Sequence, residues 1–318
     1  MTISISLLDL YENPNEKNKT AKAFMIAIPI ASMIGGMITP IGSTVNIIAI
    51  QQLSDYNVSK LTFLLWVVIS LPIAILLLFA AWFLICICLK PADIAEEDIL
   101  HYINKLDVSP NIDKREAKVL IIVGIMIVLW VLSGWITDIN TIGVSIIGCC
   151  ILMMPRIQII DVNDFVKNNN WNAFFLVGTT ISLSTAMRSN GVSDCIIFIL
   201  EKLLPNSITT RDFIVFVALC IFVLLLLVPV ATNIIPIVLP IFISIAINAN
   251  ISPVIIMLTV AYCTGNCYLL PLDIVPQITY SKGYYQMIDM FKVTIWLQLL
   301  LLIICACWLP AAEAFLHI

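Results

Sequence analysis

The stretch from Leu61 to Leu89 contains no charged residue and is flanked by Lys60 and Lys90. About 20 apolar residues in an α-helix are enough to cross the hydrocarbon core of a bilayer. Inside lipid the backbone N–H and C=O groups of a single segment must pair with one another, which a helix achieves. The composition agrees, because 61% of the residues are hydrophobic and only 11% are charged, about half the charged fraction of a soluble domain. The sequence therefore predicts an all-α integral membrane protein.

Further apolar segments follow one another and divide the chain into two regions and a linker. The first region, residues 1–89, holds an interrupted helix over 22–53 and the span 61–89, and the polar linker covers 90–118. The second region, residues 119–318, is expected to hold the spans 119–136, 141–154, 171–200 and 293–316, a re-entrant hairpin over 213–247 and a second interrupted helix over 251–280. The hairpin is predicted because 213–247 is too long for one crossing and carries Pro229, Pro236 and Pro240, and proline breaks helices. Within the linker, 94–106 is either an amphipathic helix at the membrane surface or a solvated connector.

Basic residues in the loops predict the orientation, because cytoplasmic loops carry an excess of Lys and Arg. With a cytoplasmic N-terminus and a re-entrant hairpin, the inside holds Lys17, Lys19, Lys22, Lys90, Lys105, Lys114, Arg115, Lys118, Arg156, Lys167, Lys282 and Lys292, and the outside holds Lys60, Lys202 and Arg211. We therefore expect a multi-pass protein of the plasma or inner membrane, with its N-terminus and linker in the cytoplasm.

Several classes of function are disfavoured by what the chain contains. The net charge is -4 and no long basic run is present, so nucleic acid is not an expected partner. The only histidines are His101 and His317, and no phosphate-cradling glycine loop or pair of carboxylates in an apolar setting is found, so an enzyme is not expected. Cys263 and Cys267 lie four residues apart without a second pair of ligands, whereas zinc takes about four, so no metal or other cofactor is expected.

Three interruptions of the apolar segments concentrate the polar chemistry. They are Gly35–Asn46 (GGMITPIGSTVN), Val228–Pro236 (VPVATNIIP) and Cys263–Gln277 (CTGNCYLLPLDIVPQ). Irregular backbone at membrane depth is tolerated only where protein or a water-filled cavity satisfies it. Interrupted helices in matching positions of two halves are typical of the site of a secondary transporter, with helix N-termini toward an anion and freed carbonyls toward a cation.

Each interruption also has a simpler interpretation, because Gly, Pro, Ser and Thr often mark close helix packing or a kink in membranes. Asp273 is a functional candidate by its place in the membrane, and the alternative is a cavity-facing residue near the interface. Trp66 is expected to anchor the membrane interface, and Gln298 to hydrogen-bond to a neighbouring helix. Arg188 is expected to lie near a helix end and reach toward the interface.

Short motifs across residues 20–316 resemble the divalent anion:sodium symporter family, which carries dicarboxylates, citrate or sulfate. The stretch from Ile34 to Asn46 resembles the family's first broken helix, and 129–135 with 146–148 resembles the opening of its second repeat. Pro240, Leu270-Pro271 and the stretch 283–290 resemble the remainder of that repeat. Where the family has Ser-Asn-Thr at the hairpin tip, this chain has Val230-Ala231-Thr232 followed by Asn233.

The resemblance implies an inverted-repeat secondary transporter in which 1–89 is the end of the first repeat and 119–318 is the second repeat. The family's opening helices and first hairpin have no counterpart in this sequence, so the fold is expected to be N-terminally incomplete, with a separately encoded N-terminal part as a partner. A homodimer and an elevator-type movement of the broken helices are also implied.

The implied function is secondary active transport of a small divalent anion (a dicarboxylate such as succinate, citrate, or sulfate) coupled to Na⁺. The substrate-binding candidates are Ser43, Thr44, Asn46, Thr232, Asn233 and Pro276, and the ion-binding candidates are Gly42, Asn46, Ala231, Asn233 and Asp273. Two alternatives stay open: a proton-coupled exchanger of related fold in which Asp273 carries the proton, and a truncated membrane remnant that does not transport.

Overall fold

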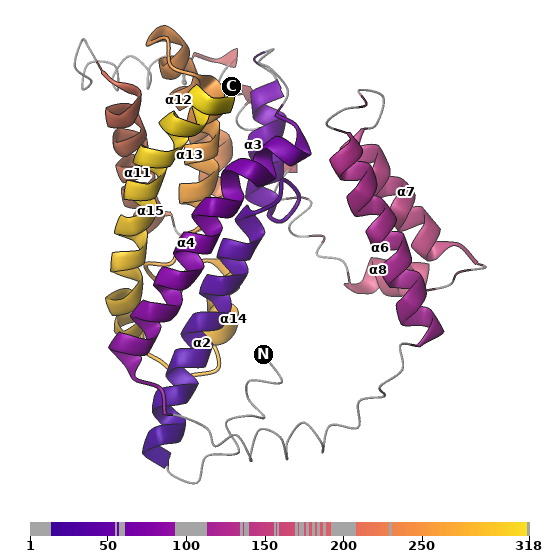
Figure 1. Cartoon of the computed structure of the whole chain (residues 1–318), viewed down its shortest axis with the longest axis horizontal. Coiled ribbons are helices and arrows are strands. Elements are labelled where there is room, and N and C mark those ends of the chain that lie inside the picture. The colour runs from indigo at the N-terminus through magenta and orange to yellow at the C-terminus, as the bar shows by residue number, and fades with distance from the viewer. Residues whose placement is uncertain are drawn as a thin grey trace.

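The structure is a computed structural model that describes residues 14–54, 56, 61–92, 113–133, 136, 140–155, 157, 159–168, scattered positions between 171 and 191, 208–228 and 231–316. Within these residues the regular structure is helical throughout (Figure 1). The helices are α2 (Pro14–Met37), α3 (Thr44–Ser54), α4 (Phe63–Leu89), α6 (Lys114–Leu132), α7 (Thr141–Met153), α8 (Val162–Asn168), α11 (Thr210–Leu227), α12 (Ala231–Asn248), α13 (Pro253–Gly265), α14 (Ile274–Tyr280) and α15 (Met287–Leu316).

Four of the described helices are long and apolar enough to cross a membrane: Asn15–Met37, Phe63–Leu89, Thr210–Leu227 and Met287–Phe315. Their ends follow local sequence signals. The Thr62 hydroxyl accepts a hydrogen bond from the Leu65 N–H at the start of α4, and the Thr209 hydroxyl does the same for Asp212 at the start of α11. Such caps satisfy N–H groups that have no partner inside the helix. The expected all-α membrane fold is confirmed.

The main bundle is built around α4, which packs against α2 on one side and α15 on the other (Figure 1). Lys22 donates a hydrogen bond to the Asp289 carboxylate at 2.8 Å, and the Ala92 N–H donates to the Thr20 hydroxyl at 3.0 Å. These contacts place the start of α2, the exit from α4 and the start of α15 at one end of the bundle.

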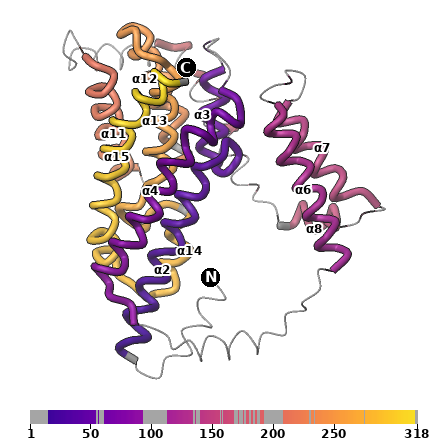
Figure 2. The backbone as a smooth tube through the Cα atoms, in the orientation of Figure 1, coloured from indigo at the N-terminus to yellow at the C-terminus, as the bar shows by residue number. Residues whose placement is uncertain are grey.

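A second, smaller unit consists of α6 and α7, which lie side by side and apart from the main bundle (Figure 2). Gly148 on α7 faces Met126 so closely that a Cβ there would collide with the Met126 sulfur. The Trp130 indole N–H donates to the Thr141 carbonyl across the pair. A stacked contact between Trp130 and Phe63, with ring centroids 5.8 Å apart, joins α6 to the start of α4.

The interruptions expected from the sequence appear as separate helices. The segment 22–53 is split between α2 and α3, 251–280 between α13 and α14, and 213–247 between α11 and α12. Two helices begin earlier than the sequence pattern indicates, α6 at Lys114 and α15 at Met287, because charged residues near the membrane surface extend a helix beyond its apolar part. The segment 94–106, Arg188 and most of 171–200 lie outside the described residues.

Trp66 corrects an expectation. Its side chain is fully buried, and its indole N–H donates to the Met37 carbonyl at 3.0 Å. It therefore does not anchor the membrane interface, because its polar N–H finds a partner inside the bundle at the end of α2. Gln298 differs too, since it is buried and neither amide atom has a hydrogen-bond partner among the described residues.

Candidate functional site

The first break, between α2 and α3, is closed by a tight turn and fastened by Asn46. The turn brings Gly42 so close to the Gly36 carbonyl that a Cβ on Gly42 would collide with it. The Asn46 side chain is buried, and its amide nitrogen donates to the carbonyls of Gly36 at 3.0 Å and Thr39 at 2.9 Å. The side-chain amide nitrogen of Asn46, a candidate ligand, is thus used to hold the break in shape.

The edge of the first break is open. Gly42 and Thr44 are exposed in the described structure, and Ser43 is half-buried. The Ser43 hydroxyl accepts a hydrogen bond from the Val45 N–H at 3.3 Å, which satisfies one N–H group at the start of α3. The N-terminus of α3 therefore lies at an accessible edge, and the helix dipole gives it partial positive charge.

The second break contains a hydroxyl group without a partner. Ala231 is buried at the start of α12, and the buried Thr232 hydroxyl has no hydrogen-bond partner among the described residues. Pro236 has no N–H, so the Thr232 carbonyl one turn earlier cannot receive its usual helical hydrogen bond. The side chain of Asn233 lies outside the description. Thr232 thus offers both a hydroxyl and a freed carbonyl at the start of a helix.

One carbonyl that the prolines of α12 leave free is compensated from α3, which the sequence did not indicate. Pro240 leaves the Pro236 carbonyl without its helical donor, and the Gln52 side-chain amide donates to that carbonyl at 2.9 Å. Just beyond the end of α3, the Tyr56 hydroxyl adds a hydrogen bond to the Pro240 carbonyl at 3.1 Å. These two bonds couple the first interrupted helix to the second break.

The third break runs from the end of α13 to the start of α14. The Asn266 amide donates to the Tyr262 carbonyl at 2.8 Å and to the Met37 sulfur at 3.2 Å, and it accepts from the Tyr268 hydroxyl. Asp273 is buried at the residue before α14. The Pro276 carbonyl, another candidate, already accepts hydrogen bonds from Thr279 and Tyr285. Of these residues, Asp273 has the side chain best suited to a cation.

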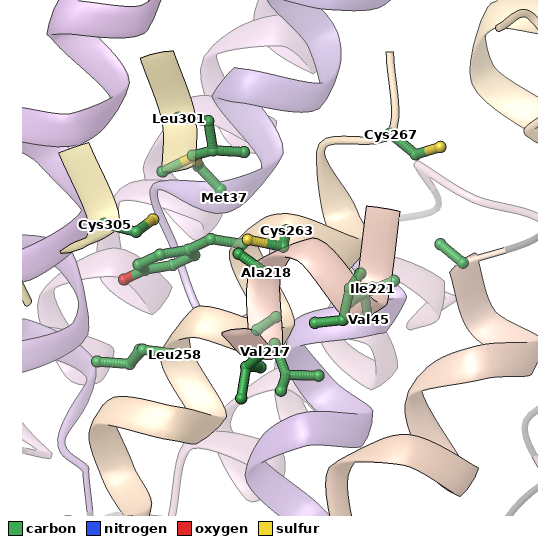
Figure 3. Packing of buried hydrophobic residues seen from close by; sticks show 14 of the residues in the cluster. Met37, Val45, Val217, Ala218, Ile221, Leu258, Cys263, Cys267, Leu301 and Cys305 are labelled. Atoms are coloured by element: carbon green, nitrogen blue, oxygen red, sulfur yellow. The ribbon is translucent and has the colours of Figure 1, made fainter. Parts of the chain in front are cut away.

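The three breaks belong to helices that pack against one another, since α3 contacts both α12 and α13. Figure 3 shows Met37 of α2, Val45 of α3 and Cys263 of α13 within one buried cluster that α11 and α15 complete. α4 braces two of the breaks, because Trp66 holds the end of α2 and the Ser70 hydroxyl lies 2.6 Å from the Tyr262 hydroxyl of α13. The helices that carry the three breaks thus share one core.

Charge in this region comes from helix ends and one carboxylate. The break segments 35–46, 228–236 and 263–277 contain no Lys or Arg, and Asp273 is their one carboxylate. The N-termini of α3 and α12 carry partial positive charge, and the C-termini of α2 and α13 carry partial negative charge. Such an arrangement offers donors to an anion and carbonyl oxygens to a hard cation such as Na⁺.

A helical membrane protein whose interrupted helices meet in its interior has the architecture of a secondary transporter. The family model described as the sodium:sulfate symporter transmembrane region matches residues 2–312, and the chain belongs to this family. The resemblance drawn from the short motifs is therefore confirmed. Because the family consists of membrane transporters, the expectation that the chain is not an enzyme is also confirmed.

Individual relatives agree with the family. The chain is 24% identical to the sodium-dependent dicarboxylate transporter SdcS of Staphylococcus saprophyticus, over 92% of this chain and 59% of the relative. It is 26% identical to an uncharacterized transporter of Methanocaldococcus jannaschii over 81% of this chain and 57% of the relative. It is 24% identical to the sodium-dependent low-affinity dicarboxylate transporter 1 of Caenorhabditis elegans over 89% and 54%. The chain thus spans more than half, but less than two thirds, of the length of each of these proteins.

Proposed function

We propose that this chain forms part of a Na⁺-coupled carrier for a divalent anion, such as succinate, citrate or sulfate. The observation that carries the proposal is the packing of three interrupted helices against one another, with break segments that contain no Lys or Arg. A doubly charged anion is costly to bury without compensation. Helix N-termini offset only part of the negative charge of the anion. Cations bound beside the anion neutralise the rest, so the movement of the cations is coupled to the movement of the anion.

The roles of the individual residues follow from their atoms. The Thr232 hydroxyl, with the first N–H groups of α12, donates to the anion. The freed Thr232 carbonyl, Ala231, Gly42 and the Asp273 carboxylate are the candidate Na⁺ ligands, because Na⁺ takes oxygen ligands. Ser43 and Thr44 at the start of α3 provide further donors, and Asn233 belongs to the same tip. Asn46 and Pro276 act by holding the breaks in shape, since the contacts of their amide and carbonyl groups are internal.

The orientation follows from the basic end of the bundle. Lys19, Lys22, Lys90, Lys282 and Lys292 lie near the start of α2, the exit from α4 and the start of α15, which share one end. Lys-rich ends face the cytoplasm, so we place this end there, in the plasma or inner membrane. The α6–α7 pair exposes Leu120, Ile121, Ile125, Ile142 and Ile146, a surface suited to lipid, to a second copy in a homodimer or to a separately encoded N-terminal part.

The test is uptake of labelled succinate, citrate and sulfate by proteoliposomes, with the chain alone and together with the N-terminal part of a relative. An inward Na⁺ gradient is expected to drive uptake in at least one of these two preparations. Uptake that follows a proton gradient and ignores Na⁺ would favour a proton-coupled exchanger with Asp273 as the carrier. No uptake in either preparation would favour a remnant that does not transport.

A matched pair of variants tests the role of Thr232. Thr232→Val removes the unpaired hydroxyl at constant shape, and we expect a substrate KM about 10- to 100-fold higher, the value of a hydrogen bond to a charged group. Thr294→Val is the control, because the Thr294 hydroxyl bonds within its own helix to the Met290 carbonyl. Equal effects of the two substitutions would contradict the assignment of Thr232 to the anion.

A further inference from the structure

A polar hollow of about 700 Å³ lies at the lysine-rich end of the bundle, away from the helix breaks. It is formed where the first turns of α2 meet the turn between α14 and α15. Its lining consists of Asn15, Asn18, Lys19, Lys22, Gly283, Tyr284, Tyr285 and Gln286. The transport site proposed above uses none of these residues.

Lys19 and Lys22 face the hollow together, because residues three apart in a helix share a face. Lys22 donates to the Asp289 carboxylate at 2.8 Å, and the same oxygen accepts from the Gln286 N–H at 3.0 Å. An ammonium group has three N–H donors, so Lys22 is held in place and keeps two of them. Lys19 is exposed and has no acidic partner within the described residues. The hollow therefore presents two ammonium groups, one of them held in place.

The hollow lies at the boundary between polar and apolar sequence on both of its walls. In α2 the polar stretch Asn15–Lys19 gives way to the apolar stretch Ala23–Met37. On the other wall, Tyr284 and Tyr285 precede α15, whose first turns expose Met287, Ile288 and Phe291. Tyrosines gather where headgroups meet the hydrocarbon core, and Tyr284 is half-buried as such a residue would be, whereas Tyr285 is buried and donates to the Pro276 carbonyl. The lysines thus lie where the polar start of α2 passes into its apolar part, and the first turns of α15 expose apolar side chains near the same hollow.

We propose that this hollow binds a phosphate group, and that the group is the headgroup phosphate of an anionic phospholipid. Lys19 and Lys22 neutralise the phosphate, and the amides of Asn15 and Asn18 with the Gln286 side chain accommodate the polar headgroup. The acyl chains lie along the exposed face of α15 at Ile288 and Phe291. A basic pocket between helix ends at the membrane surface is suited to such lipids.

The experiment is native mass spectrometry of the purified chain with phosphatidylglycerol, with phosphatidylcholine and with inorganic phosphate. We expect phosphatidylglycerol to bind more tightly than phosphatidylcholine, and millimolar phosphate to leave it bound. Lys19→Gln is expected to weaken phosphatidylglycerol binding about fivefold, the effect of one lysine near a membrane surface. This substitution leaves the pair between Lys22 and Asp289 intact, so the fold is preserved.

Two further variants complete the design. Lys22→Arg keeps the charge and is expected to retain binding, and Lys114→Gln removes an equally exposed lysine from α6 and is expected to have no effect. Equal binding of the two lipids, or equal losses for Lys19→Gln and Lys114→Gln, overturns the proposal. Displacement of phosphatidylglycerol by millimolar phosphate overturns the lipid assignment and identifies a site for a free anion. Neither result depends on transport.

Discussion

Replacing Asn46 by alanine tests whether this side chain holds the first break in shape. Its amide nitrogen is the donor to the carbonyls of Gly36 and Thr39, at 3.0 and 2.9 Å. Alanine leaves both oxygens without this donor in a half-buried setting. An unsatisfied buried polar group costs about 1–3 kcal/mol. The Thr39 carbonyl keeps the Gly42 N–H as a donor at 3.1 Å, so the cost comes mainly from the Gly36 carbonyl and is about 1–3 kcal/mol.

Water recovers part of that loss. Gly42 and Thr44 are exposed at the edge of the break, and a bridging water replaces a direct hydrogen bond at modest entropic cost. We therefore expect Asn46→Ala to lower the free energy of unfolding by about 1–2 kcal/mol. Asn46→Asp keeps the volume and removes the donors, so it is expected to destabilise the protein at least as much.

The measurement is reversible unfolding by SDS in mixed micelles, followed by circular dichroism. Gln51→Ala is the control, because Gln51 is exposed on the same helix, and such surface changes stay within about 0.5 kcal/mol. An Asn46→Ala variant as stable as the Gln51→Ala variant would refute the bracing role. Uptake alone does not separate the two roles of Asn46, since losing a ligand and losing the break both abolish it.

Other outcomes follow from single contacts. Trp66→Phe should lower the free energy of unfolding in the same assay by about 1 kcal/mol or more, through loss of the bond to the end of α2, whereas Trp82→Phe at an exposed position should not; equal effects would contradict the buried role. Gln298→Leu should raise stability by about 1–3 kcal/mol, because it removes two buried polar atoms without partners in the described structure, and a clear loss of stability would show that the amide has a partner such as water. In a variant without other reactive cysteines, an impermeant thiol reagent applied to intact cells should modify a cysteine that replaces Arg211 and spare a cysteine that replaces Lys282. The reverse labelling pattern would show that the orientation is the opposite one.

The first break could be predicted because its cause is local. Glycine tolerates close approach of the backbone, so Gly36 and Gly42 mark that interruption whatever surrounds them. Proline removes an N–H wherever it occurs, but Pro236 and Pro240 lie inside the continuous helix α12, so a proline by itself does not decide where a helix ends. The roles of side chains at the breaks depend on distant partners. The Gln52 side-chain amide donates to the Pro236 carbonyl of α12, which lies 184 residues further along the chain. Nothing near Gln52 in the sequence indicates this hydrogen bond.

The sequence by itself determined that the chain is a bundle of membrane helices with interrupted segments, because hydropathy and missing backbone donors act within one segment. Tertiary structure decided which polar groups are used up in holding the breaks and which stay available. Trp66 shows the reason: an indole N–H is equally well satisfied at the membrane interface or by a buried carbonyl, and only the packing of α4 against the end of α2 selects the carbonyl. By the same reasoning the amide of Asn46 and the carbonyl of Pro276 bond within the breaks, while the Thr232 hydroxyl has no partner among the described residues.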